Sequence, residues 1–222
     1  MNRRLVVVAD RNAHPVFCPG ESGVAEQPEL SQVFLKDTLA LSSSLHAGTA
    51  DAPALILAYC GEREWYQHRA SSYWLLLPQM GSTVAQWLDN VLIALAPEPD
   101  DETVFLGTRT PHLSCRLLEQ AFDGLARFDS VVGPCEQGSV YLLGVRGRWP
   151  TGCLADADWQ GKRTLPDVRQ ALRRARLSCA ALDRHYGLYD TDDLERLRLH
   201  LHEYAEGTLK NTRHFLSGHE NQ

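Results

Sequence analysis

Three side chains suited to acid–base or anion chemistry lie in the middle of the chain, at Arg109, His112 and Glu136. An arginine is permanently cationic, so Arg109 could hold a phosphate or carboxylate through two parallel hydrogen bonds without any metal. One hypothesis is therefore a metal-independent anion site that combines Arg109 with Arg11, His14 and His112. The alternative is that Arg109 is an exposed loop residue or pairs with Glu136.

Acidic residues of the second half are secondary candidates for a divalent-cation site, because hard cations prefer carboxylate oxygens. The candidates are Asp156, Asp158, Asp190 and Asp192. Thr191, with acids on both sides and Glu195 after it, is typical of the start of a helix. For the group around residue 191 we therefore favour helix capping over metal binding.

Residues 162–176 hold six bases and one acid. If this segment is a helix with Val168 and Leu172 inward, then Arg169, Arg173 and Arg176 share its outer face. Two interpretations stay open. The segment is either a patch for an acidic partner or a phosphate group, or an ordinary solvated helix face.

The hydrophobic pattern alternates between strand and helix along the whole chain. Expected strands are residues 5–9, 54–59, 73–77, 103–106, 130–133, 140–145 and a short one within 177–182. Expected helices are residues 31–45, 83–96, 114–128, 166–177 and 192–206. Ser114 and either Ser82 or Thr83 are the expected caps of two of these helices. This alternation predicts an α/β fold with a mostly parallel sheet, whose ligands bind at the carboxyl ends of the strands.

Two stretches have no clear pattern. Residues 10–29 are rich in Pro and Gly and are expected to form a long loop, of the kind that often binds ligands. Residues 207–222 are expected to be a polar C-terminal tail, either frayed or with a short helix around residues 209–216. The domain proper is then residues 1–206.

Two motifs lie on either side of the helix expected at 114–128. The first, residues 107–113, fits the pattern G-[ST]-D-x-P-x-L except at its third residue. Gly107, Thr108, Pro111 and Leu113 match it. The second has the pattern G-P-x-x-D-G-G-Y-Y-L-[LI]-G, and it is matched by Gly133, Pro134, Gly138, Tyr141, Leu142, Leu143 and Gly144. With these motifs the chain resembles the DUF2064 family, which is similar to cofactor guanylyltransferases and other nucleotide-diphospho-sugar transferases. The resemblance extends over residues 4–200 and implies a single-domain, three-layer GT-A fold with a Rossmann-like sheet.

The resemblance also implies a nucleotide or nucleotide-sugar site. The residues placed in it are Asp10, Arg11, His14, Gln79, Gly81, Thr108, Arg109, Gln137 and Gly138. Catalytic candidates are Arg109, His112 and Glu136. Mg²⁺ or Mn²⁺ is implied only if the chain is an active transferase, since the metal would neutralise the diphosphate as it leaves.

The family's functional residues are replaced at four places. Arg109 stands where the first motif has its acid, and Gln137 stands where the second has one. Residues 11–23 lack the family's K-T-R, and residues 82–88 lack the acid and the base of D-L-G-x-R. Because arginine cannot ligate a metal, these departures argue that the family's chemistry is lost or altered.

Two functions follow as hypotheses. The first is a catalytically degenerate transferase-like protein that acts as a binding or partner protein, with a nucleotide, a protein or a second copy as its partner. The alternative is an active transferase with a non-standard or metal-independent site.

Composition excludes other classes. The chain has 22 basic and 28 acidic residues and a net charge of −6, which disfavours nucleic-acid binding. Its apolar runs are too short to span a membrane, and only residues 5–9 follow the basic start, unlike a secretion signal. Six cysteines without a C-x-x-C spacing favour reduced thiols, so we expect a cytoplasmic protein.

Overall fold

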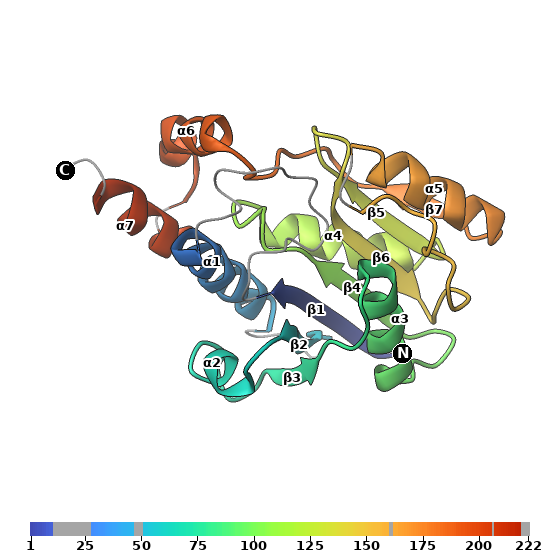
Figure 1. The fold of residues 1–222 in the computed structure, drawn as a ribbon. Coiled ribbons are helices and arrows are strands. Elements are labelled where there is room, and N and C mark those ends of the chain that lie inside the picture. Colours follow the sequence, from blue (N-terminus) through green and yellow to red (C-terminus); the bar gives the residue numbers. More distant parts are fainter. Residues whose placement is uncertain (11–27, 47–50, 160–161, 206, 219–222) are drawn as a thin grey trace.

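The computed structural model describes residues 1–10, 28–46, 51–159, 162–205 and 207–218. Within these residues, seven strands form one sheet in the order β3-β2-β1-β4-β6-β5-β7 (Figure 1). The strands are β1 (Arg3–Asp10), β2 (Ala54–Cys60), β3 (Leu75–Pro78), β4 (Glu102–Leu106), β5 (Ser130–Pro134), β6 (Val140–Arg146) and β7 (Cys179–Ala181). All neighbouring strands are parallel except β6, which is antiparallel to β4 and to β5. The predicted mostly parallel α/β sheet is confirmed.

Helices cover both faces of the sheet. They are α1 (Pro28–His46), α2 (Arg63–Gln67), α3 (Val84–Leu95), α4 (Cys115–Leu125), α5 (Thr164–Arg174), α6 (Thr191–His200) and α7 (Lys210–Gly218), with the 3-10 turn η1 (Leu201–Glu203) after α6. Side chains of α1 and α4 pack on one face of the sheet, and those of α3 and α5 pack on the other. Among the described residues, no helix combines the length and the apolar character needed to cross a bilayer.

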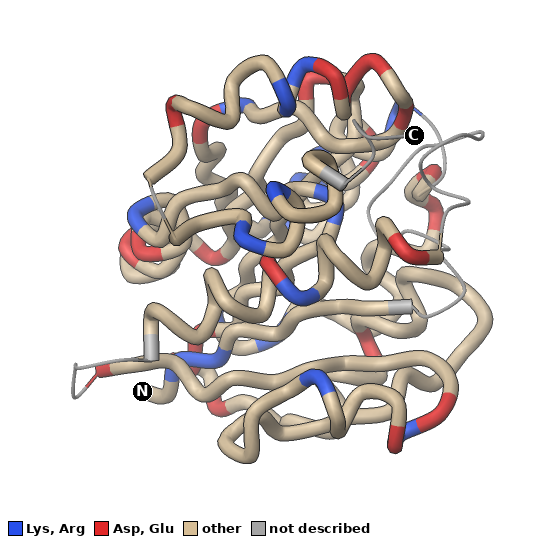
Figure 2. Tube along the Cα trace, turned by 90° about the vertical axis from the view of Figure 1, so that its left-hand side faces the viewer, with Lys and Arg blue, Asp and Glu red and all other residues tan. Residues whose placement is uncertain are grey.

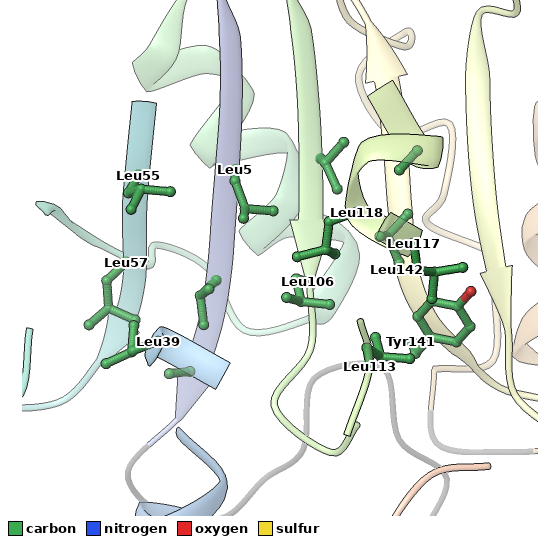
Figure 3. Close-up of a cluster of buried hydrophobic side chains, with 14 of the residues drawn as sticks. Leu5, Leu39, Leu55, Leu57, Leu106, Leu113, Leu117, Leu118, Tyr141 and Leu142 are labelled. Atoms are coloured by element: carbon green, nitrogen blue, oxygen red, sulfur yellow. The ribbon is translucent and has the colours of Figure 1, made fainter. Parts of the chain in front are cut away.

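The central strand β1 shows why the sheet needs both layers. Leu5, Val7 and Ala9 belong to the core under α1 and α4, whereas Val6 and Val8 belong to the core under α3 and α5. Alternate residues of a strand point to opposite faces, so a continuous apolar run is buried on both. Figure 3 shows the first of these cores, where leucines of β1, β2 and β4 meet those of α1 and α4. Each such side chain, fully buried, contributes about 1.5–3 kcal/mol.

A third, smaller core joins the C-terminal part of the chain to α1. Leu30 and Phe34 of α1 pack with Tyr186, Leu188 and residues of α6 and α7. The short helix considered for the polar tail is therefore present as α7. It lies beside α1 (Figure 1).

Most differences from the predicted elements are at their ends. The third strand begins at Leu75 instead of residue 73, because Trp74 closes a turn by donating its backbone N–H to Ser71, and the strand includes Pro78. Helix α1 begins at Pro28, before the predicted cap Ser31, and proline is favoured in a first turn. Helix α2 was not predicted.

The predicted starts of two helices are confirmed. Thr83 accepts a hydrogen bond from the backbone N–H of Gln86, and Ser114 accepts one from that of Leu117. The predicted helix 166–177 is shifted: α5 begins two residues earlier, at Thr164, and ends at Arg174. The predicted helix 192–206 ends at His200 and continues only as η1.

Candidate functional site

The parallel topology brings the loops that hold Gln79, Arg109 and Gln137 to one edge of the sheet. The strands β1, β2, β3, β4, β5 and β7 all end at this edge, and β6 begins there. Gly107, directly after β4, donates its backbone N–H to Tyr141 at the start of β6. The loops of the two sequence motifs are therefore neighbours at the carboxyl edge, as ligand sites in such sheets require.

Arg109 is buried in this edge. Its side chain is 5% exposed, and the guanidinium donates to Ser31 Oγ at 3.3 Å and lies over the ring of Phe34, both on α1. Its backbone carbonyl accepts a hydrogen bond from the N–H of Leu188 at 2.9 Å. The interpretation of Arg109 as an exposed loop residue is therefore wrong. Packing of α1 and of the chain around residue 188 on this loop removes it from solvent.

Glu136 pairs with a different arginine. Its two carboxylate oxygens accept hydrogen bonds from Arg196 of α6 at 2.6 and 3.1 Å. These bonds hold the pKa of Glu136 below its usual range. The guanidinium of Arg196 also lies 4.0 Å above the ring of Tyr186. The predicted pairing of Arg109 with Glu136 is thus wrong, because α6 supplies the partner.

His112 stacks on the same tyrosine. Its ring centroid lies 4.4 Å from that of Tyr186, with the ring planes 24° apart, and the residue is 6% exposed. Burial lowers the pKa of His112 to about 3, helped by the nearby His185 and Arg196, and the backbone of Tyr186 offsets this only in part. Within the described part of the chain, neither ring nitrogen has a well-aligned hydrogen-bond partner. His112 is therefore a neutral, weakly basic imidazole inside an aromatic cluster.

Gln137 holds the C-terminal segment in place. Its side-chain N–H donates to Asp193 Oδ1 at 3.2 Å, and its side-chain oxygen accepts the backbone N–H of Gly187 at 3.3 Å. The other oxygen of Asp193 accepts the N–H of Tyr189 at 3.0 Å, and burial raises the pKa of Asp193. Both ends of the Gln137 amide are thus used within the protein.

The next residue along the chain, Gly138, has a backbone conformation and a close neighbour that exclude a side chain. Gly138 has φ +86°, and a Cβ there would collide with the carbonyl oxygen of Lys162. Only glycine fits this position without a shift of the neighbouring segment.

Gln79 and Gly81 lie in the connection from β3 to α3. The amide of Gln79 donates to the carbonyls of Ala9 and Ala58, at 3.1 and 2.7 Å, and so joins the ends of β1 and β2. Gly81 has φ +113° and accepts a hydrogen bond from the indole of Trp87. Both residues lie at the predicted edge of the sheet, and these hydrogen bonds join them to other residues of the protein.

The remaining predicted binding residues are placed only in part. Thr108 is half-buried in the loop after β4. Asp10 is the last residue of β1, opposite Cys60 of β2. Arg11 and His14 lie outside the described residues.

The four secondary acidic candidates do not form a cluster. Asp156 is exposed and lies 3.8 Å from Arg174, and Asp158 belongs to the same turn before α5. Asp190 caps α6 by accepting the backbone N–H of Asp193, a role predicted for Thr191, and Asp192 is exposed on the first turn. Among the described residues there is no group of three His, Cys, Asp or Glu side chains that could hold a metal.

Sequence reasoning missed Tyr186 and Arg196, and it missed the contacts of Tyr189 and of Asp193, which it considered only as a possible metal ligand. All come from the C-terminal segment that covers the carboxyl edge. The aromatic residues at 186 and 189, directly before a helix cap, were the available signal. Nothing in the sequence showed that they lie on the loops after β4 and β5.

Comparison with known proteins agrees with the fold and with the two motifs. A profile of the family described as "Uncharacterized protein conserved in bacteria (DUF2064)" matches residues 41–161. No curated protein matches the chain.

Solved structures resemble the chain over nearly its whole length. A candidate nucleotide-diphospho-sugar transferase from Desulfovibrio desulfuricans G20 has 16% identity and a TM-score of 0.75, covering 96% of this chain and 95% of that protein. A 4-diphosphocytidyl-2C-methyl-D-erythritol synthase has 13% identity and a TM-score of 0.58, covering 90% and 99%. CMP:2-keto-3-deoxy-manno-octonic acid synthetase, in complex with CTP, has 10% identity and a TM-score of 0.53, covering 91% and 99%. At these identities the likeness establishes the transferase-type fold.

Proposed function

The chain belongs to the DUF2064 family, and from this premise we propose that it is a nucleotide-binding protein that has lost metal-dependent transfer. Its ligand would be a nucleotide or nucleotide sugar, bound at the carboxyl edge of the sheet. The structural neighbours named above support this ligand class, since one of them is a complex with CTP.

The observation behind the proposed loss of transfer is the environment of Arg109. This residue stands at the family's first acidic position, and its guanidinium is buried against Ser31 and Phe34 of α1. A cation at that position would repel a divalent metal instead of ligating it. The second acidic position holds the neutral Gln137, whose amide is used by Asp193 and Gly187. The described residues therefore do not fit the metal site that the fold family implies.

An active, metal-independent transferase is the rival function. It would need a general base, and the candidates are Glu136 and His112. The pKa of Glu136 is lowered and its carboxylate is bound by Arg196 on both oxygens, so it accepts a proton poorly. The pKa of His112, about 3, makes its imidazole a weak base at neutral pH. Neither candidate is tuned for proton transfer near pH 7, which favours binding over turnover.

Thermal unfolding with a ligand panel tests this proposal. The panel contains nucleoside triphosphates and nucleotide sugars, each with Mg²⁺, with Mn²⁺ and with a chelator, and the same samples are assayed for released phosphate or pyrophosphate. Binding at a hundredfold excess over Kd stabilises by about 2.7 kcal/mol, which raises Tm by roughly 5–10 °C in a chain of this size.

We expect a Tm shift with at least one nucleotide, unchanged in chelator, and no turnover. Thr108→Val should reduce the shift, whereas Thr151→Val, on the exposed turn before α5, should not. Metal-dependent turnover would overturn the proposal in favour of a transferase. Turnover in chelator would establish the metal-independent rival, and no shift with any ligand would exclude nucleotide binding.

A further inference from the structure

The sheet has an open edge at β7. This strand pairs only with β5 among the described residues, and it is the last strand in the sheet order. Ser178 and Leu182 direct their backbone groups toward β5, where they bond to Ser130 and Val132. Because backbone direction alternates along a strand, the N–H and C=O groups of Cys179 and Ala181 point outward. They offer up to four hydrogen bonds to an added strand.

Apart from the three-residue length of β7, the sequence of this edge has no feature that protects an edge strand against pairing with another chain. Residues 177–182 hold no charged side chain and no proline, and the strand itself is Cys-Ala-Ala. Natural edge strands are commonly protected by charges, prolines or bulges. An unprotected edge is a place where an extended peptide can add by main-chain hydrogen bonding.

A row of three arginines, two on α5 and one in the turn that follows it, flanks this edge. Leu177 and Cys179 pack in the same core as Val168 and Leu172 of α5, and Figure 1 shows α5 alongside β7. The charge of Arg169 acts on the thiol of Cys179, which places this arginine near the strand. Arg169 and Arg173 are exposed and lie four residues apart, so they share one side of α5, and the exposed Arg176 lies in the turn between α5 and β7. Among the described residues, none of these three has an ion-pair partner.

Most acidic side chains near the β7 edge have hydrogen-bond or ion-pair partners of their own. The carboxylate of Asp129 accepts hydrogen bonds from Ser178 and is paired with Arg146. Asp167 is paired with Arg163 on the side of α5 that faces the turn before it. Asp183 follows the strand and is itself followed by Arg184, so this pair adds no net charge. In the view of Figure 2, which looks from the left-hand side of Figure 1, basic and acidic positions are interspersed along the chain. The arginine row has basic residues only.

From these observations we propose that the β7 edge and the row formed by Arg169, Arg173 and Arg176 are a docking surface for an extended acidic segment of a partner protein. The segment would add as a strand beside β7, with alternate side chains about 7 Å apart. These would face Arg169 and Arg173, about 6 Å apart along α5, and Arg176 in the turn before β7. A second copy of this chain fits less well, because pairing two β7 edges would bring two arginine rows together. This inference does not depend on what binds at the carboxyl edge.

Fluorescence anisotropy tests the proposal with a labelled peptide of alternating Glu and Val. Three comparisons use full-length protein: wild type, the triple variant R169Q/R173Q/R176Q, and the matched control R63Q/R116Q/R148Q. The control removes the same charge from three exposed arginines on α2, on α4 and after β6. A peptide with alternate N-methylated backbone nitrogens and a Lys–Val peptide are also measured. Hydrogen exchange at the amides of Cys179 and Ala181 is followed with and without the Glu–Val peptide.

We expect the Glu–Val peptide to bind and to bind more weakly at high salt. The triple variant should lose about tenfold in affinity and the control less than twofold. N-methylation or Lys for Glu should abolish binding, and the two amides should exchange more slowly in the complex. Equal affinity of the methylated peptide would mean a non-specific basic surface and would overturn the proposal. Equal losses in both triple variants, no binding at all, or concentration-dependent self-association that protects the two amides would overturn it as well.

Discussion

The carboxylate of Asp37 on α1 should be what attaches the C-terminal helix α7 to the domain. It is 4% exposed and accepts four hydrogen bonds. Two come from the backbone N–H and side-chain amide of Asn211, at 3.1 and 2.8 Å, and two from the N–H and hydroxyl of Thr212, at 2.8 and 2.6 Å. These backbone groups lie in the first turn of α7, whose N–H groups have no partner inside the helix. Asp37 thus caps α7 from a residue 174 positions away.

The magnitude follows from what Asp37→Ala would leave without a partner. Thr212 is fully buried, so its N–H and hydroxyl would both lose their acceptor, at about 1–3 kcal/mol for each group. Loss of a helix cap costs about 1 kcal/mol, and this overlaps with the first term because the Thr212 N–H is one of the capped groups. We expect Asp37→Ala to lower the free energy of unfolding by about 3 kcal/mol. If docking of α7 is worth less than this, the helix detaches and the loss stops at the docking energy.

Urea unfolding measures the loss in the free energy of unfolding of the whole domain. Hydrogen exchange at the amides of α7 shows whether this helix detaches while the rest stays folded. A double-mutant cycle with Thr212→Val isolates the carboxylate–hydroxyl interaction, for which we expect a coupling of about 1 kcal/mol or more. Asp123→Ala, at an exposed acid on α4, is the control and should change stability by less than about 0.5 kcal/mol. A loss below about 1 kcal/mol in Asp37→Ala, with unchanged exchange in α7, would refute the assigned role.

Three further predictions concern the carboxyl edge and its surroundings. Gly138→Ala should cost about 2–4 kcal/mol in urea unfolding, whereas Gly152→Ala, with φ +77° but no atom near its Cβ, should cost only about 1–2. The lowered pKa of His112 means that the unfolded chain binds a proton below pH 6.5 that the native chain refuses until about pH 3. The stability that is present above pH 6.5 is therefore lost as the pH falls, by up to about 1.4 kcal/mol per pH unit. In urea unfolding at pH 7, 5 and 4, His112→Phe should show a smaller dependence of stability on pH. Glu136→Gln should lower stability by less than about 1 kcal/mol, measured by Tm, because its ion pair with Arg196 is partly solvated.

The fold could be predicted from the sequence because its signals are local. The apolar run in β1, the helical spacing in α3 and the caps Thr83 and Ser114 each depend on a few neighbouring residues, and the structure has all of them. The boundaries that differ have tertiary causes. Helix α5 ends at Arg174 and the chain turns at Arg176, which has φ +61°, to enter β7. No pattern in the sequence marks that left-handed residue.

The sequence predicted where on the sheet the candidate site lies, but it did not predict which residues contact one another there. Motif spacing put Arg109 and Gln137 at the same edge of the sheet, because strand ends meet there. Their partners come from distant parts of the chain: Ser31 lies 78 residues from Arg109, and Asp193 lies 56 residues from Gln137. Side-chain direction and burial depend on such packing, so the sequence could not distinguish a solvent-facing arginine from a buried one.

Arg109 and Gln137, at the two positions where the resemblance implies acids, both contact the segment that covers them. The backbone N–H of Leu188 bonds to the carbonyl of Arg109, and that of Gly187 bonds to the side chain of Gln137. The Gln137 amide also donates to Asp193 at 3.2 Å, and Asp193 is buried with a raised pKa. An acid at position 137 would place two carboxylates at that distance in a poorly solvated site, where like charges repel strongly. An amide there supplies a donor to Asp193 and an acceptor to Gly187, so Gln137 is required by the packing that the C-terminal segment has adopted. Gln137→Glu alone should therefore weaken this packing and lower the stability to urea.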